Sequence, residues 1–178
     1  KDYVRRIGIN NYINVIPTGI QITKYSNYEM DIERKNNLYK TFDIKENSII
    51  CLALGRVAAE KNIEEVVTFF KRFRNDNNEY DLRLIVVGDG PQREKIIKEC
   101  LADNSNTFIH MIGKVPLSDV PFFYNLSSIY LSGSTSETQG LTYIEAMASH
   151  VVPIVRYDSN LVGLIDDSVN GYFYENYD

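Results

Sequence analysis

Two glutamates flank a glycine in the stretch SETQGLTYIEAMAS, and their spacing could serve chemistry. Glu137 precedes Gly140, and Glu145 stands eight positions after Glu137 in a segment with helical character. If a helix begins beyond Gly140, the free N–H groups of Leu141 and Thr142 point out of its first turn and suit a phosphate. Glu145 lies one turn on along the same side, where its carboxylate can accept hydrogen bonds from both hydroxyls of a ribose. Glu137 could accept from the hydroxyls of a second sugar, so the two carboxylates and the helix start together describe a site for a nucleotide sugar.

A simpler interpretation assigns the same two glutamates to the stability of the helix. Glu137 would cap the helix or interact with the positive end of its dipole. Glu145 would then be a partly exposed helical residue. The residue types alone leave both interpretations open.

Two cations follow an earlier apolar run, in the stretch GRVAAEKN (55–62). Arg56 offers directional hydrogen bonds and Lys61 a point charge, a combination that suits a diphosphate. The alternative is a pair of surface cations, with Lys61 paired to Glu60 or Glu64. Position alone does not separate these two readings.

The glycines of VVGDGP, Gly88 and Gly90, admit two interpretations. They could form a turn that lies against a phosphate, or only a tight connection between a strand and a helix. The pattern is not a dinucleotide fingerprint, because it lacks the third glycine and follows the second strand rather than the first.

The histidines and cysteines are expected to be structural. His110 lies in an apolar strand and is predicted to be a core residue with its hydrogen bonds satisfied. His150 follows the predicted end of a helix, where a left-handed C-terminal cap is expected. Cys51 and Cys100 are the only cysteines, and without C-x-x-C spacing they predict neither a disulfide scaffold nor a zinc site.

Strand and helix patterns alternate through the chain from residue 48 onward. Apolar runs closed by glycine are typical of strands buried on both faces, and apolar residues at helical spacing follow them. The predicted strands are 48–55, 82–90, 107–115, 129–134 and 151–157, and the predicted helices are 62–76, 91–103, 117–127 and 141–149. The pattern predicts an α/β fold with a doubly wound, mostly parallel, Rossmann-like sheet. Ligands of such sheets bind beyond the carboxyl ends of the strands, where the stretches named above lie.

Residues 1–47 are less regular, so the domain is predicted to span 48–178. A strand is expected at 13–20, followed by a polar, loop-rich segment with one helical turn. We interpret 1–47 as a lead-in from a preceding domain that is absent from this chain. The start without a methionine and the abrupt end suggest a piece of a longer protein.

Composition limits the classes of partner and compartment. The net charge of −5 makes nucleic acid a poor candidate. No apolar run approaches the roughly 20 residues of a membrane span, and the first residues lack the apolar segment of a signal peptide. The expected location is the cytoplasm, with the thiols reduced.

The chain resembles the C-terminal, donor-binding domain of family 4 retaining glycosyltransferases, which have the GT-B architecture. The similarity spans nearly all of residues 13–175, and the stretches that carry it are VIPTGI, GRVAAEKN, VVGDGP, MIGKVP, SETQGLTYIEAMAS, VPIV and NGYFY. The spacing of the two glutamates, followed by Ala-Met-Ala, is the most specific of these. The resemblance implies that the fold is one half of a GT-B enzyme.

The resemblance also implies a role for each candidate residue. Arg56 and Lys61 would hold the donor diphosphate and stabilise it as the leaving group. Glu145 would bind the ribose and Glu137 the hydroxyls of the donor sugar, so that Arg56, Lys61 and Glu137 are the expected catalytic residues. The remaining expected donor-binding residues act mainly through their backbone: Gly55, Gly88, Lys114, Val115, Gln139, Gly140, Leu141 and Thr142. Lys114 and Val115 would read the base, which is usually uracil.

The implied reaction is transfer of a hexose, with glucose the first candidate, from a UDP-sugar with retention at the anomeric carbon. No protein nucleophile is expected, and the absence of an Asp-x-Asp motif predicts no catalytic metal and no cofactor beyond the donor. The missing N-terminal domain would supply the acceptor pocket and any peripheral contact with the inner face of the membrane. This piece alone is expected to be inactive.

The acceptor is suggested by a variation within the motif. Many members of the family have Glu-Gly-Phe-Gly where this chain has Glu-Thr-Gln-Gly. This version, with RYDSNLVGLI, is similar to bacterial enzymes that glucosylate diacylglycerol. Alternatives are a cell-surface polysaccharide or other glycan as acceptor, a nicotinamide-dependent oxidoreductase domain, and a non-catalytic α/β binding module.

Overall fold

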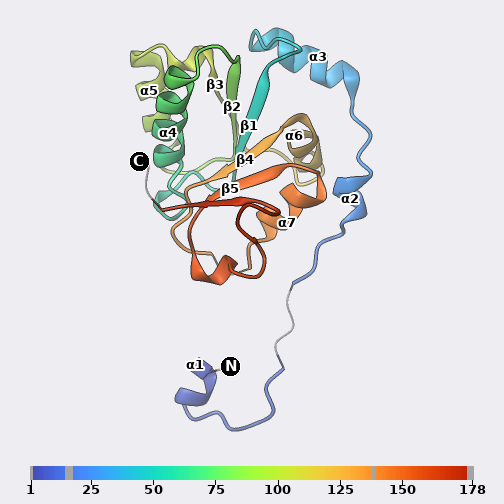
Figure 1. Ribbon diagram of the computed structural model, residues 1–178, viewed down its shortest axis with the longest axis vertical. Coiled ribbons are helices and arrows are strands. Elements are labelled where there is room, and N and C mark those ends of the chain that lie inside the picture. Colours follow the sequence, from blue (N-terminus) through green and yellow to red (C-terminus); the bar gives the residue numbers. More distant parts are fainter. Residues whose placement is uncertain (1, 15–17, 138, 176–178) are drawn as a thin grey trace.

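The computed structural model describes residues 2–14, 18–137 and 139–175, whose strands form one parallel sheet (Figure 1). The strand order is β3-β2-β1-β4-β5-β6, and every neighbouring pair runs parallel. The strands are β1 (Ile49–Leu54), β2 (Leu82–Val87), β3 (Ile109–Gly113), β4 (Ile129–Ser132), β5 (Val152–Arg156) and β6 (Tyr172–Tyr174). The order reverses between β1 and β4, which is where ligands bind in doubly wound sheets. The predicted doubly wound sheet is confirmed.

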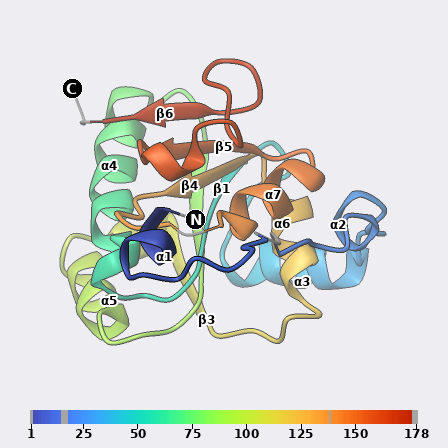
Figure 2. The ribbon, with the colours of Figure 1, turned by 90° about the horizontal axis from the view of Figure 1, so that it is seen from below.

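Helices cover both faces of this sheet, as Figure 2 shows with the sheet seen nearly edge-on. One face carries α4 (Ile63–Asp76) and α5 (Arg93–Ala102), and the other carries α2 (Thr23–Ser26), α3 (Ile32–Thr41), α6 (Val120–Leu126) and α7 (Leu141–Ala148). The remaining elements are α1 (Asp2–Arg6) and the short 3-10 turns η1 (Ala59–Lys61), η2 (Ser105–Thr107) and η3 (Ser159–Leu161). Within the described ranges, no helix is long and apolar enough to cross a membrane.

Alternation along β2 explains how one strand serves two cores. All its residues are buried, and successive side chains point to opposite faces of the sheet. Leu84 and Val86 join the core under α4 and α5, whereas Ile85 and Val87 join the core under α6 and α7. Arg83, the one charged residue of the strand, is held by the Asp81 carboxylate at 2.8 Å and the Thr107 carbonyl oxygen at 2.9 Å.

The segment before β1 is more ordered than we predicted. The described residues of the expected strand, 13–14 and 18–20, are not in strand conformation, and 15–17 lie outside the described residues. The single helical turn expected after it was an underestimate, because both α2 and α3 form. Asp31 caps α3 by accepting a hydrogen bond from the Arg34 N–H at 2.9 Å, a signal that we missed. Tyr25 and Ile44 are buried in the core that α6 and α7 cover.

The C-terminal end of the sheet also differs from the prediction. We expected β5 to be the last strand, but Tyr172–Tyr174 pairs with it as β6. This strand is three residues long and only partly buried, so it lacks the apolar run by which the other strands were found.

The two histidines occupy the predicted positions. His150 has a φ of 60° after α7, and the His150 and Val151 N–H groups bond to the Met147 and Ala146 carbonyl oxygens at 3.0 and 2.9 Å. This is a Schellman cap, so the predicted left-handed cap is confirmed. His110 is 4% exposed and stacks on Phe42, with ring centroids 4.5 Å apart. Its predicted core location is confirmed, but the expectation of satisfied hydrogen bonds is wrong, because Nε2 has no partner among the described residues.

Burial of His110 makes the stability of the protein depend on pH. Burial lowers the pKa of His110 from 6.5 to about 4, and the charge of Arg83 acts in the same direction. The unfolded chain therefore binds a proton that the folded chain excludes, and stability is full above pH 6.5 and falls toward pH 4. Between pH 7 and pH 5 we expect a loss of about 2 kcal/mol in the free energy of unfolding.

Urea unfolding at pH 7 and pH 5 measures this loss. His110→Gln should flatten the pH dependence in that interval, whereas His150→Gln, at an exposed position, should retain it. The same slope in wild type and His110→Gln would show that another group carries the effect.

Candidate functional site

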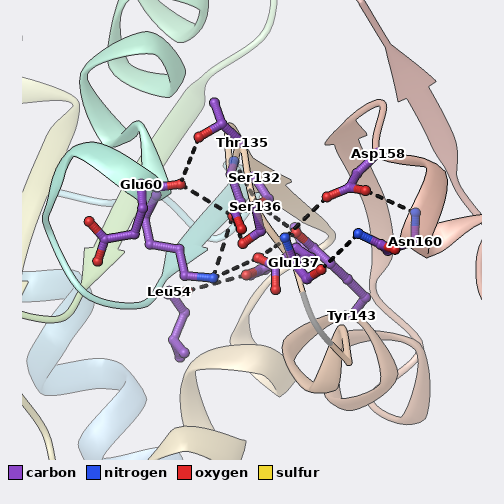
Figure 3. A network of polar contacts seen from close by, with 12 residues as sticks. Leu54, Glu60, Ser132, Thr135, Ser136, Glu137, Tyr143, Asp158 and Asn160 are labelled. Carbon is purple, nitrogen blue, oxygen red and sulfur yellow. Dashed lines mark hydrogen bonds and ion pairs between the residues drawn. The ribbon is translucent and has the colours of Figure 1, made fainter. Parts of the chain in front are cut away.

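The loops that follow β1 and β4 meet at the point where the strand order reverses. Lys61, at the end of η1, donates a hydrogen bond to Glu137 Oε1 at 2.6 Å, and the side chains are 29% and 10% exposed. Figure 3 shows Glu137 and the polar contacts around it. The alternative partners that the sequence offered for Lys61 are engaged elsewhere. Glu60 lies 3.8 Å from Arg56 Nη1, and Glu64 accepts from Lys95 at 2.8 Å. The structure therefore joins Lys61 and Glu137, two of the predicted site residues, in a partly buried ion pair.

The Glu137 carboxylate is held by a second donor from α7. The Tyr143 hydroxyl lies 3.0 Å from Glu137 Oε1 and 3.0 Å from Ser132 Oγ. Burial raises the pKa of Tyr143 above its usual value, so its hydroxyl stays protonated and donates to the carboxylate. Helix capping was the simpler interpretation of Glu137, but Gly140 is the capping residue of α7. Among the described residues, the Glu137 carboxylate bonds to the side chains of Lys61 and Tyr143 and not to the N–H groups of that helix start.

A hollow opens beside this ion pair at the start of α7. It has a volume of about 190 Å³ and is lined by Lys61, Glu137, Gln139, Gly140, Leu141 and Thr142. Gly140 has a φ of 63°, and a Cβ at this position would come within 2.7 Å of Leu164 Cδ2. A side chain is therefore disfavoured by the backbone conformation and requires the surrounding side chains to shift. The first N–H groups of α7 have no partner within the helix and are available beside the hollow.

A larger hollow lies at the carboxyl ends of the first three strands. It has a volume of about 690 Å³ and is lined by Gly55, Arg56, Gly88, Asp89, Gly90 and Lys114. Val115, the other residue predicted to read the base, is partly buried and packs against the core under α6 and α7. Most of the predicted site residues thus divide between two hollows, with Arg56 at the larger and Lys61 at the smaller, whereas Val115 and Glu145 line neither.

The close approach of two loops accounts for the glycines of VVGDGP. A Cβ on Gly88 would lie 1.8 Å from the Gly55 carbonyl oxygen, and one on Gly90 would lie 2.4 Å from the Val57 carbonyl oxygen. This supports the interpretation of a tight connection between strand and helix. A role of these glycines next to a phosphate stays a prediction.

Glu145 is not among the residues that line the smaller hollow, and its carboxylate bonds to two tyrosines. Tyr25 donates to Oε1 at 2.6 Å, and the Tyr124 hydroxyl lies 3.1 Å from Oε2. Burial, with the hydrogen bond to Glu145, raises the pKa of both tyrosines, so both hydroxyls stay protonated. A carboxylate has about four lone-pair sites, so Glu145 can still accept from further hydroxyls. The alternative of a partly exposed helical glutamate describes its burial but not these two bonds.

Apart from Lys61, the side chains that bond to the two glutamates were not predicted from the sequence. Tyr25 comes from α2, far from Glu145 in sequence, and no pattern linked the two. Asp158 and Asn160 follow β5, where their side chains bond to the backbone of Glu137 at 3.1 Å each. Hydrogen bonds from the backbone N–H groups of Asn160 and Glu137 lower the pKa of Asp158. The stretch RYDSN (156–160) follows a predicted strand at the ligand-binding edge of the sheet, but its residue types gave no pairing with Glu137.

No three His, Cys, Asp or Glu side chains within the described parts of the chain are placed to hold a metal ion. The absence of a catalytic metal stays a prediction. The site as described brings Arg56, Lys61 and the carboxylates of Glu137 and Glu145 to the edge of the sheet. Such groups suit the phosphates and hydroxyls of a nucleotide sugar.

Comparison with known proteins agrees with this chemistry. The family model of glycosyl transferases group 1 matches residues 35–178. The alpha-monoglucosyldiacylglycerol synthase of Acholeplasma laidlawii is 30% identical over 177 residues, which are 97% of this chain and 43% of the relative. The enzyme of the same name from Streptococcus pneumoniae is 31% identical over 160 residues, covering 90% of this chain and 36% of the relative.

A solved structure supports the same fold assignment. HepE of Anabaena, in complex with UDP and glucose, has a TM-score of 0.70 at 16% identity, over 92% of this chain and 43% of that chain. The expected half of a GT-B architecture is confirmed. The chain spans about two fifths of the length of the curated relatives it matches. Its match over residues 35–178 shows that the chain belongs to the group 1 glycosyltransferases.

Proposed function

We propose that this chain is the donor-binding half of a retaining hexosyltransferase that moves glucose from UDP-glucose to diacylglycerol. The observation that carries the proposal is the Lys61–Glu137 pair beside the start of α7, at the reversal of the strand order. The names of the two relatives support glucose and diacylglycerol, and the HepE complex supports UDP. The absent N-terminal domain would bind the acceptor and provide any peripheral membrane contact from the cytoplasmic side.

Each residue has a role that follows from its chemistry. The diphosphate would lie against Lys61, Arg56 and the first N–H groups of α7, which together neutralise its charge. The ion pair with Glu137 would then open, because phosphate replaces the carboxylate as the partner of Lys61. The released Glu137 carboxylate would accept from hydroxyls of the hexose. Glu145, oriented by two tyrosines, would accept from the ribose, while the backbone near Lys114 would contact the base.

The transfer step follows from this arrangement. The bond between the anomeric carbon and the phosphate oxygen breaks, and its electron pair leaves with UDP. The acceptor hydroxyl attacks from the face that the phosphate leaves, and its proton passes to a phosphate oxygen. Lys61 would stabilise the charge that develops on the leaving group, so that the protein acts by positioning and electrostatics.

Titration with UDP-glucose, UDP and NAD, followed by backbone amide NMR shifts, tests the proposal. We expect saturable shifts with both uridine ligands, centred on residues 140–145 and on the loop that contains Arg56.

Glu145→Ala should weaken UDP binding by about 1–3 kcal/mol, since hydrogen bonds to a charged acceptor are lost. Glu99→Ala, an exposed glutamate on α5, serves as the control and should bind normally. Shifts with NAD alone would exclude the proposed function, and unchanged affinity in Glu145→Ala would remove Glu145 from the site.

A further inference from the structure

Two residues of the loop after β5 hold the backbone of Glu137 on both sides (Figure 3). The Glu137 N–H donates to Asp158 Oδ2 at 3.1 Å, and Asn160 Nδ2 donates to the Glu137 carbonyl oxygen at 3.1 Å. The two residues also organise each other, since the Asn160 N–H donates to Asp158 Oδ1 at 2.9 Å. We propose that Asp158 and Asn160 form a clamp that positions Glu137 for the sugar of the donor, an inference that rests on the proposed function.

The position of Glu137 in the chain explains why such a clamp is needed. Glu137 lies in the irregular loop between β4 and α7, so neither strand nor helix partners fix its peptide groups. Upstream, the Thr135 N–H bonds to the Glu60 carbonyl oxygen at 3.0 Å and ties the loop to η1. With the clamp, the residue is held at its N–H, at its carbonyl oxygen and, through Lys61 and Tyr143, at its carboxylate. A carboxylate that recognises hydroxyl groups must be held within about 0.5 Å of its productive position.

Core packing does not account for the clamp. Asn160 is exposed and Asp158 is only partly buried. Bonds between exposed polar groups contribute little to global stability, because water competes for both partners. The expected consequence is therefore local and concerns Glu137, the group proposed to contact the hexose rather than the nucleotide. UDP-glucose and UDP differ in that hexose, so the ratio of their dissociation constants measures the effect of the clamp.

Three variants of the full-length protein test the clamp. Asp158→Ala and Asn160→Ala each remove one bond to Glu137, and Asn160→Asp replaces a donor by a carboxylate that repels the Glu137 carbonyl oxygen. Relative to wild type, each alanine variant should raise the ratio of the UDP-glucose to the UDP dissociation constant about fivefold, as expected for one hydrogen bond. Asn160→Asp should raise it further. Binding of UDP itself should change less than about twofold, because the hexose contact is the one disturbed.

A matched control comes from the same connection between β5 and β6. Asn170 Nδ2 donates to the Leu164 carbonyl oxygen at 3.2 Å, and Asn170 Oδ1 accepts from the Asp166 N–H at 2.9 Å. Asn170→Ala therefore deletes two bonds of the same kind without touching Glu137. It should leave the ratio at the wild-type value. The amide resonance of Glu137 in the unliganded protein gives a second readout. It should move in Asp158→Ala and stay in place in Asn170→Ala.

The outcomes separate the clamp from the function on which it rests. If wild type binds UDP and UDP-glucose but the three variants keep its ratio, the clamp is excluded and the proposed function stands. Equal weakening of both ligands would also exclude the clamp, because it indicates general loss of structure. If wild type binds neither ligand, the proposed function fails and the clamp with it. If Asp158→Ala does not fold, Asp158→Asn takes its place in the test. Asn retains one acceptor oxygen, so the ratio of dissociation constants should lie between the wild-type value and the value expected for the alanine variant.

Discussion

Replacing Lys61 by alanine in the full-length protein is expected to lower kcat roughly 100- to 1000-fold, the range for loss of one positioned group that stabilises developing charge. The dissociation constant of UDP-glucose should rise by less than about tenfold, because Arg56 and the start of α7 still hold the diphosphate. The difference arises because the negative charge on the phosphate grows as the sugar leaves, so Lys61 interacts more strongly with the transition state than with the bound donor. Single-turnover rates and separate binding isotherms measure the two quantities.

The ion pair of Lys61 with Glu137 supplies an internal check on that prediction. Lys61→Ala leaves the Glu137 carboxylate, which is 10% exposed, without its cation. This uncompensated charge disturbs the site and slows turnover even if Lys61 has no role toward the leaving group. Lys61→Ala combined with Glu137→Gln removes the uncompensated charge, and its UDP binding, in which Glu137 has no proposed role, should match that of Lys61→Ala. Lys95→Ala, which breaks an ion pair with Glu64 on the helical face, should leave kcat unchanged. Normal turnover in Lys61→Ala would exclude its role toward the leaving group.

Gly88→Ala is expected to destabilise the protein by about 3 kcal/mol or more, by adding a clash to an unfavourable backbone conformation. The new Cβ would lie 1.8 Å from the Gly55 carbonyl oxygen, and the residue has a φ of 139°. The neighbouring backbone has little freedom to move away. The Gly55 N–H bonds to the Val87 carbonyl oxygen at 3.0 Å, and the Gly88 N–H bonds to the Gly113 carbonyl oxygen at 2.8 Å.

Gly163→Ala separates strain from contact in that experiment. Gly163 also has a positive φ, 87°, but a Cβ there meets no atom within 4 Å. We therefore expect a loss of only about 1–2 kcal/mol, the cost of a left-handed conformation for a residue with a side chain. Denaturant unfolding of both variants gives the comparison. Equal losses would mean that the packing of the two loops contributes nothing to the requirement for glycine at position 88.

The sequence by itself determined the central elements, because their signals are local. β1 to β5 and α4 to α7 were predicted within a few residues of their bounds, since apolar runs and helical spacing arise from burial against a sheet. The elements that we missed have weak local signals. α3 buries no residue completely, and β6 is short and partly exposed, so neither carries a clear apolar pattern.

For the site, the sequence determined which groups are present and at which edge of the sheet they lie. Strand direction alone brings the loops that contain Arg56, Lys61, Glu137 and Gly140 to the carboxyl ends of the strands. Which side chains pair was decided by tertiary structure. Lys61 had nearer candidates in Glu60 and Glu64, yet it bonds to Glu137, because the reversal of strand order places β4 directly beside β1.

The supports of the two glutamates also depended on tertiary structure. Tyr25 reaches Glu145 because α2 packs against α6 and α7, and Asp158 reaches Glu137 because β5 lies next to β4. Spacing along the chain gives no information on such contacts, because they form only when separate elements pack. The residue types thus indicated the chemistry of the site, and the order of the strands and helices decided how each charged group is held.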